Sequence, residues 1–228
     1  LDEIIARRVT VLSAYQNAAY AARYRHLVAR VQAKEAAVLP GQSALSETVA
    51  RYLFKLMAYK DEYEVARLYA DGSFQKQVEA TFEATSASGQ KLRYEFNLAP
   101  PLLAKVDPVT GEPRKMTFGP WMMSAFGLLA KLKGLRGTAF DVFGYTHERR
   151  TERQLIADYE AMLGELIAKL TPETHALCVA LAATPEKIRG FGHVKERHLK
   201  AARAEEAELL ERLRDGSTAA LAMSRAAE

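Results

Sequence analysis

Apolar residues recur every three or four positions through most of this chain, and that spacing is typical of helices packed against a core. In residues 2–38 the pattern predicts one long helix that ends at Pro40-Gly41. Its predicted inner face is Ile5, Val9, Leu12, Tyr15, Ala19, Ala22, His26 and Ala29. Because His26 belongs to this face, we expect a packed histidine rather than a ligand.

Further helices follow from the same spacing and from capping residues. Ser46 is the expected N-cap of a helix that runs to about Asp71. Thr146 is the expected cap of a long helix, and two Thr-Pro-Glu triplets, at 171–173 and 184–186, are typical helix starts. The other predicted helices are a short one around 74–82, one from Pro120 to Gly134 and a charged one over 194–214.

One stretch changes period. Leu92, Tyr94, Phe96 and Leu98 alternate with polar residues, which is the pattern of a half-buried strand. Residues 102–118 favour a hairpin around the turn-forming segment 107–113. The predicted fold class is therefore mainly α, a multi-helix domain with a small antiparallel β-hairpin or sheet insertion around residues 91–118.

The 228 residues suffice for one self-contained domain. We predict a single helical domain over residues 1–214, ended by Asp215-Gly216, and a frayed tail over 215–228. The chain begins with Leu1 rather than with Met, which favours a piece of a longer polypeptide.

Charge and cysteine content narrow the function classes. Thirty-two basic and 28 acidic residues are interspersed, so no basic stripe for nucleic acid is visible. No apolar run reaches membrane-spanning length and no signal peptide opens the chain, so we expect a cytoplasmic protein with neither nucleic acid nor membrane as partner. The single cysteine, Cys178, cannot build a zinc or iron–sulfur site and is expected to be a buried apolar residue.

Familiar catalytic patterns are missing from the sequence. The glycines at 190 and 192 lack the third glycine of a dinucleotide fingerprint, and no HExxH metal motif occurs. We therefore predict neither a catalytic residue nor a metal site. The polar cluster 59–64 is interpreted as a solvated helix face with Lys60–Glu64 and Glu64–Arg67 pairs. The basic run 147–150 opens a helix, where cations are slightly unfavourable, so an acidic group is expected to oppose it, and another domain is one source of that group.

A basic segment with two glycines is the strongest binding candidate. Backbone amides just before a helix start suit anions, and nearby cations add to that preference. An ordinary interhelical turn is the competing interpretation. The candidate anion or partner contacts are Arg189, Gly190, Gly192, His193, Lys195 and Arg197.

Several long segments, in order, carry a family resemblance. They are AYQNAAYAARY at 14–24, VARYLFKLMAYKDEYEVARLY at 49–69, LAPPLL at 98–103, FGPW at 118–121, LKGLRGT at 132–138 and IRGFGHVK at 188–195. Together they resemble the C-terminal region of bacterial single-chain indolepyruvate ferredoxin oxidoreductases, of the 2-oxoacid:ferredoxin oxidoreductase family.

The resemblance implies a parent enzyme that oxidatively decarboxylates aryl pyruvates to arylacetyl-CoA. Thiamine diphosphate with Mg²⁺, [4Fe–4S] clusters, CoA as co-substrate and ferredoxin as electron acceptor are implied for that enzyme. In the family these cofactors are held upstream, and none of their motifs occurs in this chain. No catalytic residue is carried over to it.

Three hypotheses follow. The first is an accessory structural domain that docks on the upstream domains of the same polypeptide, and it includes the possibility of a homo-oligomer. The second is a free-standing helical domain that binds an acyl-CoA, an aryl acid or another protein, using the apolar faces around Trp121. The third, an independent enzyme using the cluster 60–64, ranks last because nothing pairs a nucleophile with an oriented base.

Overall fold

The computed structural model describes residues 1–81, 93–99, 114–190 and 192–216. The protein is mainly α-helical with a small two-stranded antiparallel sheet, which confirms the predicted fold class. The chain divides into two compact units, unit 1 (Leu1–Tyr59 and Arg150–Glu228) and unit 2 (Lys60–Arg149). The single domain predicted over residues 1–214 stays a prediction, because compactness does not test independent folding.

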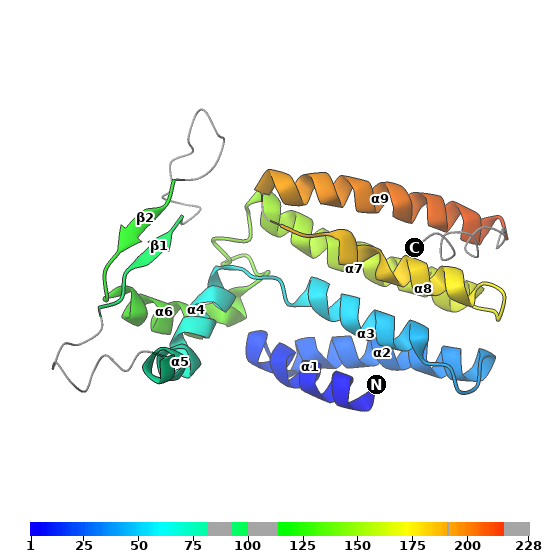
Figure 1. Cartoon of the computed structure of the whole chain (residues 1–228), viewed down its shortest axis with the longest axis horizontal. Helices are drawn as coiled ribbons and strands as arrows, with labels where there is room; N and C mark the ends of the chain where they lie inside the picture. Colours follow the sequence, from blue (N-terminus) through cyan, green and yellow to red (C-terminus); the bar gives the residue numbers. More distant parts are fainter. Residues whose placement is uncertain (82–92, 100–113, 191, 217–228) are drawn as a thin grey trace. The chain divides into compact units, whose positions relative to one another are not determined.

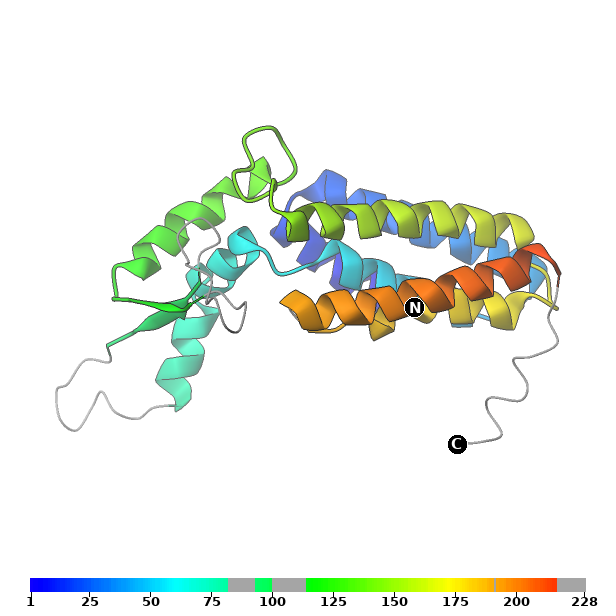
Figure 2. The ribbon, with the colours of Figure 1, turned by 90° about the horizontal axis from the view of Figure 1, so that it is seen from above.

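Unit 1 is a bundle of long helices. Figures 1 and 2 both show them side by side along one common direction. Its helices are α1 (Asp2–Tyr15), α2 (Ala18–Val38), α3 (Ala44–Met57), the part of α7 (His147–Lys169) from Arg150 onward, α8 (His175–Ala183), the 3-10 turn η2 (Thr184–Lys187) and α9 (Gly192–Arg214).

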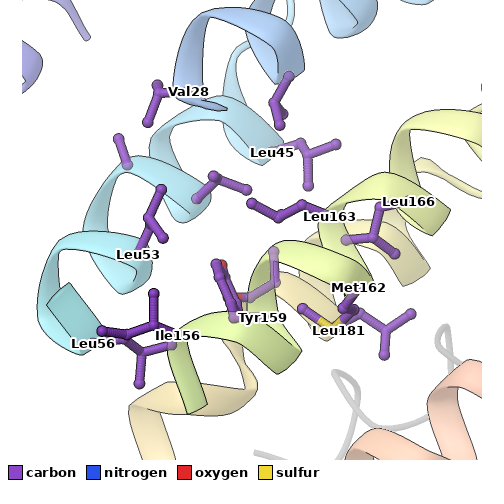
Figure 3. Close-up of a cluster of buried hydrophobic side chains, with 14 of the residues drawn as sticks. Val28, Leu45, Leu53, Leu56, Ile156, Tyr159, Met162, Leu163, Leu166 and Leu181 are labelled. Atoms are coloured by element: carbon purple, nitrogen blue, oxygen red, sulfur yellow. The ribbon is translucent and has the colours of Figure 1, made fainter. Parts of the chain in front are cut away.

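The core of unit 1 joins the two separate stretches of chain that form it. Leu53 and Leu56 of α3 lie in one buried cluster with Ile156 and Tyr159 of α7 (Figure 3). The Tyr159 hydroxyl donates to the Ala182 carbonyl at 2.8 Å, so the buried ring keeps its polar atom satisfied. Each such large apolar side chain stabilises the fold by about 1.5–3 kcal/mol when buried.

The single helix predicted over residues 2–38 is wrong. It breaks at residues 16 and 17, where the Asn17 side chain accepts the Tyr20 amide at 2.9 Å and starts a new helix. The break shifts the helical phase, so Ala19, Ala22, His26 and Ala29 are exposed. The buried residues of α2 are Ala21, Tyr24, Val28, Val31 and Glu35.

The helix predicted from Ser46 to Asp71 is also two helices. α3 ends at Met57, and α4 starts at Glu62 with Asp61 as its N-cap. Ser46 lies inside α3 and does not cap it. The Glu35 carboxylate satisfies that helix start instead, because it accepts the Leu45 and Ser46 amides at 2.8 Å each.

Unit 2 combines short helices with the sheet. Its elements are α4 (Glu62–Ala70), α5 (Ser73–Thr81), β1 (Phe96–Leu98), β2 (Met116–Phe118), α6 (Met122–Lys131) and the 3-10 turn η1 (Leu132–Leu135) (Figure 1). β1 pairs with β2 in antiparallel register, Phe96 opposite Phe118. The predicted turn at 107–113 lies outside the described residues. The core of unit 2 consists of Ala66, Phe96, Met122 and Phe126. The Tyr69 ring stacks on the Phe126 ring, with 5.0 Å between the ring centroids.

Of the helix starts predicted in the second half of the chain, some are confirmed and others are wrong. The Thr146 hydroxyl accepts the Arg149 amide at 3.3 Å, so the predicted cap of α7 is confirmed. The triplet at 184–186 starts only the 3-10 turn η2, and α8 begins after Thr174 rather than at the triplet 171–173. α9 ends at Arg214, as the Asp215-Gly216 stop predicts. The tail from residue 217 lies outside the described residues.

Candidate functional site

A cavity of about 490 Å³ lies within unit 2, and most of its lining is apolar. Residues of α4, α6 and the two strands form its walls, and four aromatic rings are among them. The apolar lining residues are Val65, Leu98, Ala99, Phe118, Trp121, Met122, Ala125, Phe126, Leu129 and Phe143. The charged lining residues are Lys60, Asp61, Glu62, Glu148 and Arg149. An apolar pocket of this size with a few polar groups is typical of a small-molecule site.

Asp61 is already engaged in structural contacts. It forms a two-point ion pair with Arg136, at 2.5 Å to Nε and 2.8 Å to Nη2, and both side chains are only 3% exposed. Its Oδ1 also accepts the Glu64 amide at 2.8 Å and so caps α4. A charge that is buried with its partner in this way stabilises the unit only while the pair is complete.

The polar cluster 59–64 is therefore not the solvated face expected from the sequence. Asp61, Tyr63 and Glu64 are all buried. The predicted Glu64–Arg67 pair is confirmed, with the guanidinium donating to both carboxylate oxygens at 2.8 Å. The predicted Lys60–Glu64 pair does not occur among the interactions of the described residues, and Lys60 is exposed.

Glu62 is the unusual carboxylate of the cavity. Its Oε2 is buried and has no hydrogen-bond partner among the described residues. Arg149 Nε lies 3.6 Å from it, so the acid expected opposite the basic run 147–150 is present within unit 2. Burial raises the pKa of Glu62, and Arg149 offsets only part of that effect. Perturbed acids in apolar clefts mark candidate sites.

The loop that follows α6 is held by one aspartate. Asp141 is buried and accepts the amides of Gly137 at 2.8 Å and Gly144 at 3.0 Å. The Tyr63 hydroxyl also donates to it, at 3.2 Å. Burial, together with the Asp141 charge, raises the pKa of Tyr63 far above its ordinary value, so this hydroxyl keeps its proton.

Exposed apolar side chains occur on this loop, on α6 and on neighbouring elements of unit 2. All of the large apolar side chains that are exposed among the described residues belong to unit 2. We call them the apolar surface of unit 2: Leu68, Met116, Trp121, Leu128, Leu132, Phe140, Val142 and Tyr145. Phe140 and Leu128 are the most open, at 76% and 65% exposure.

This chain is similar to a known protein family. The model of a family described as "Family of unknown function (DUF6537)" matches residues 1–208. The chain belongs to the DUF6537 family. Searches of the curated proteins and of the solved structures gave no match to this DUF6537 chain.

In the DUF6537 chain the described part of the basic segment is a bend at Gly190 and the first turns of α9, from Gly192 to Arg197. Arg189 pairs with Glu186 at 3.1 Å, and Lys195 pairs with Glu152. The structure thus gives each of these two cations its own carboxylate rather than aiming both at one point. Gly192, His193 and Arg197 are exposed. Anion binding by this segment stays a prediction.

The [4Fe–4S] cluster implied for the parent enzyme does not fit this DUF6537 chain. A [4Fe–4S] cluster needs four thiolates, and the chain has one cysteine. Cys178 is fully buried, as predicted, and burial raises its pKa to about 11. In the described ranges no three His, Cys, Asp or Glu side chains gather as metal ligands, and no helix has the length and apolar character needed to cross a bilayer.

Sequence reasoning missed Glu62 and its position in the cavity. The apolar character of α6, which follows Trp121, was a visible signal, because its residues are apolar on nearly every side. Nothing in the local spacing indicated that Glu62 and Arg149, which are far apart in the chain, line the same cavity.

Proposed function

We propose that this domain is an accessory, non-catalytic part of an indolepyruvate ferredoxin oxidoreductase and docks on the upstream domains of the same polypeptide. The observation that carries the proposal is the apolar surface of unit 2. Unit 2 carries every large apolar side chain that is exposed among the described residues, and exposed apolar side chains that adjoin one another mark an interaction surface. The resemblance over residues 1–214 supplies the identity of the parent enzyme.

In this proposal the chemistry belongs to other domains. Thiamine diphosphate with Mg²⁺ and the [4Fe–4S] clusters would be bound there, and CoA and ferredoxin would react there. The domain described here would hold those parts together or shape the approach of CoA or ferredoxin. The basic segment from Arg189 to Arg197 is the candidate contact for an anionic partner, because clustered cations steer anions.

The test is reconstitution in two pieces. The parent enzyme truncated before Leu1 is assayed for indolepyruvate-dependent ferredoxin reduction, with and without the present chain added in trans. We expect the chain to restore activity and to co-elute with the truncated enzyme. The double variant Leu128→Asp/Phe140→Asp should bind at least ~10-fold more weakly, because docking would bury two unpaired charges.

The matched control adds a charge to unit 1. Ala29 is exposed on α2, so Ala29→Asp should behave as the unmodified chain does. Full activity of the truncated enzyme without the chain would contradict a role in turnover. Equal binding of the double variant and the control would contradict docking through the apolar surface of unit 2.

The cavity of unit 2 favours a second candidate function, ligand binding. Its volume of about 490 Å³ lies within the range of small-molecule pockets. Trp121 is the only tryptophan of the chain and lines this cavity, so its fluorescence reports occupancy directly. Titration with aryl pyruvates or acyl-CoA should quench that fluorescence. A flat titration with both classes would exclude them as ligands.

A further inference from the structure

One side of α6 carries exposed apolar side chains from end to end. Trp121 and Leu132 cap the two ends of the helix, and Leu128 lies between them at spacings of seven and four residues. Because these spacings place side chains on the same side of a helix, the three residues form one stripe, and all three are exposed. Met122 and Phe126, on another side of the helix, are buried in the core of unit 2. We call Trp121, Leu128 and Leu132 the outer strip of α6, which spans about 16 Å at the helical rise per residue.

The outer strip is continuous with the strand before it. The ring of Phe118, the last residue of β2, meets the ring of Trp121 edge to face, with 5.9 Å between the ring centroids. Gly127 precedes Leu128, and a Cβ built on it meets nothing within 4 Å, so no described neighbour packs closely on that part of α6. Apolar side chains therefore adjoin one another here, which is the property that marks an interaction surface.

The segment that carries the strip has charges of one sign. Residues 114–140, which include β2, α6 and η1, contain no acid and five cations: Arg114, Lys115, Lys131, Lys133 and Arg136. Arg136 is buried in its ion pair with Asp61, whereas Lys131 is exposed. Lys131 follows Leu128 by three positions and directly precedes Leu132, so it lies beside the strip.

The acids of the neighbouring cavity do not change this sign. Asp61 is paired with Arg136, and Arg149 lies 3.6 Å from Glu62 and 3.5 Å from Glu148. A surface with apolar side chains and a basic border favours a partner with apolar side chains and an acidic border. It disfavours a second copy of this chain, because a symmetric pair would place the same cations face to face.

We propose that the outer strip of α6 docks on an acidic amphipathic segment of the upstream domains, which covers the strip with apolar side chains and places an Asp or Glu beside Lys131. This inference rests on the first proposed function, docking through the apolar surface of unit 2. It adds the part of that surface that makes the contact and the chemistry of the segment that it meets.

Zero-length cross-linking tests the contact in the intact parent enzyme. A carbodiimide joins a lysine amine to a carboxylate that touches it, and mass spectrometry of the digested protein identifies both residues. We expect Lys131 to be joined to an Asp or Glu that precedes Leu1 in the parent polypeptide. Lys200, an exposed lysine of α9 in unit 1, is the matched control and should not be joined to that segment.

A charge reversal measures how much the contact contributes to docking. Lys131→Glu should bind the parent enzyme truncated before Leu1 about 10-fold more weakly than the unmodified chain, because attraction to the acid becomes repulsion. Added salt should weaken the unmodified chain and reduce the difference between the two, since salt screens exposed charges. Arg30→Glu, at an exposed site of α2, makes the same change in net charge and should bind as the unmodified chain does.

The outcomes separate this inference from docking itself. Unchanged affinity of Lys131→Glu, with no cross-link from Lys131 to an upstream acid, would overturn the acidic segment and leave docking through the apolar surface in place. Full affinity of Leu128→Asp/Phe140→Asp for the truncated enzyme would overturn both. Binding of the chain to phosphatidylserine vesicles, but not to the truncated enzyme, would assign the strip to a membrane surface and overturn the proposal as well. The cross-linking needs no variant to fold.

Discussion

Glu35 is a buried charge that connects three helices of unit 1. It projects from α2, accepts two amides at the start of α3, and lies 2.8 Å from Nε2 of His175 in α8. The Ser46 hydroxyl donates to the same carboxylate. Burial opposes ionisation, but hydrogen bonds from Ser46, His175 and the two amides outweigh it and hold the pKa of Glu35 below its usual value.

Stability should therefore depend on the ionisation of Glu35. A lowered folded-state pKa stabilises the fold above the ordinary value of 4.5, and that contribution is lost as the pH falls through the folded-state pKa. At pH 7, Glu35→Gln should lower the free energy of unfolding by about 3 kcal/mol, as expected for lost bonds to a buried charge. Urea unfolding of the unmodified chain and of Glu35→Gln, at pH 7 and at stepwise lower pH, measures this difference in the free energy of unfolding.

The control for this experiment is Glu165→Gln. Glu165 pairs with Arg214 at 2.7 Å, but that arginine side chain is 58% exposed, so the change should cost less than about 1 kcal/mol. If the difference between the unmodified chain and Glu35→Gln does not shrink as the pH falls below 4.5, Glu35 does not hold its charge in the folded state.

Buried charges were the residues that the sequence concealed. Asp61 was interpreted as part of a solvated face, because its partner Arg136 lies 75 positions away in the chain. The burial of Cys178 was predicted correctly, because the residues on both sides of it in the sequence are apolar. Local sequence indicates an apolar environment well, but it does not reveal a distant ion-pair partner.

At the scale of elements, the turn before α9 depends on Gly190. Its φ is +91°, and a Cβ there would lie 2.8 Å from Cγ1 of Val194. Gly192 also has a positive φ, +54°, but a Cβ there meets nothing within 4 Å. Both sites disfavour other residues through backbone conformation, and Gly190 adds a steric clash.

Gly190→Ala should therefore destabilise the protein more than Gly192→Ala. We expect about 1 kcal/mol for Gly192→Ala, from backbone strain alone, and about 2–3 kcal/mol for Gly190→Ala. Thermal unfolding of the two variants side by side gives the comparison. Equal losses would show that Val194 moves aside without cost.

Helices and the β insertion were predictable because their periodicity is local. Their breaks were not, because the chain uses side-chain caps at Asn17 and Asp61 in place of Gly or Pro. A cap of this kind fits inside an unbroken apolar pattern. Because the break near Asn17 was missed, the inner face of α2 was predicted with the wrong residues. The helix that starts after the break has a different rotational phase.

At the scale of the whole molecule, the described residues form two hydrophobic clusters. The larger cluster lies in unit 1, whereas Ala66, Phe96, Met122 and Phe126 form the small core of unit 2. The cavity of unit 2 could not be predicted from spacing, because its walls come from residues 60 to 149. These residues are distant in the sequence, and only the folded structure places them around one cavity.

Separate cores should unfold separately. Asp61→Asn breaks the buried two-point ion pair with Arg136 and should cost unit 2 about 3–5 kcal/mol. The urea midpoint reported by Trp121 fluorescence should then fall, while the midpoint reported by far-UV circular dichroism, dominated by unit 1, should move less. Leu163→Ala, in the core of unit 1, should give the reverse pattern. Joint movement of both midpoints in both variants would indicate one cooperative unit.

The order of the chain also has a consequence for synthesis. α1, α2 and α3 leave the ribosome before the rest of this domain, but their core partners in α7 and α8 follow only after the inserted residues 60–149. At about 5–20 residues per second, those 90 residues take roughly 5–20 s. During that interval the nascent bundle presents its inner apolar face to the cell, which makes it a client for chaperones that hold unfinished chains.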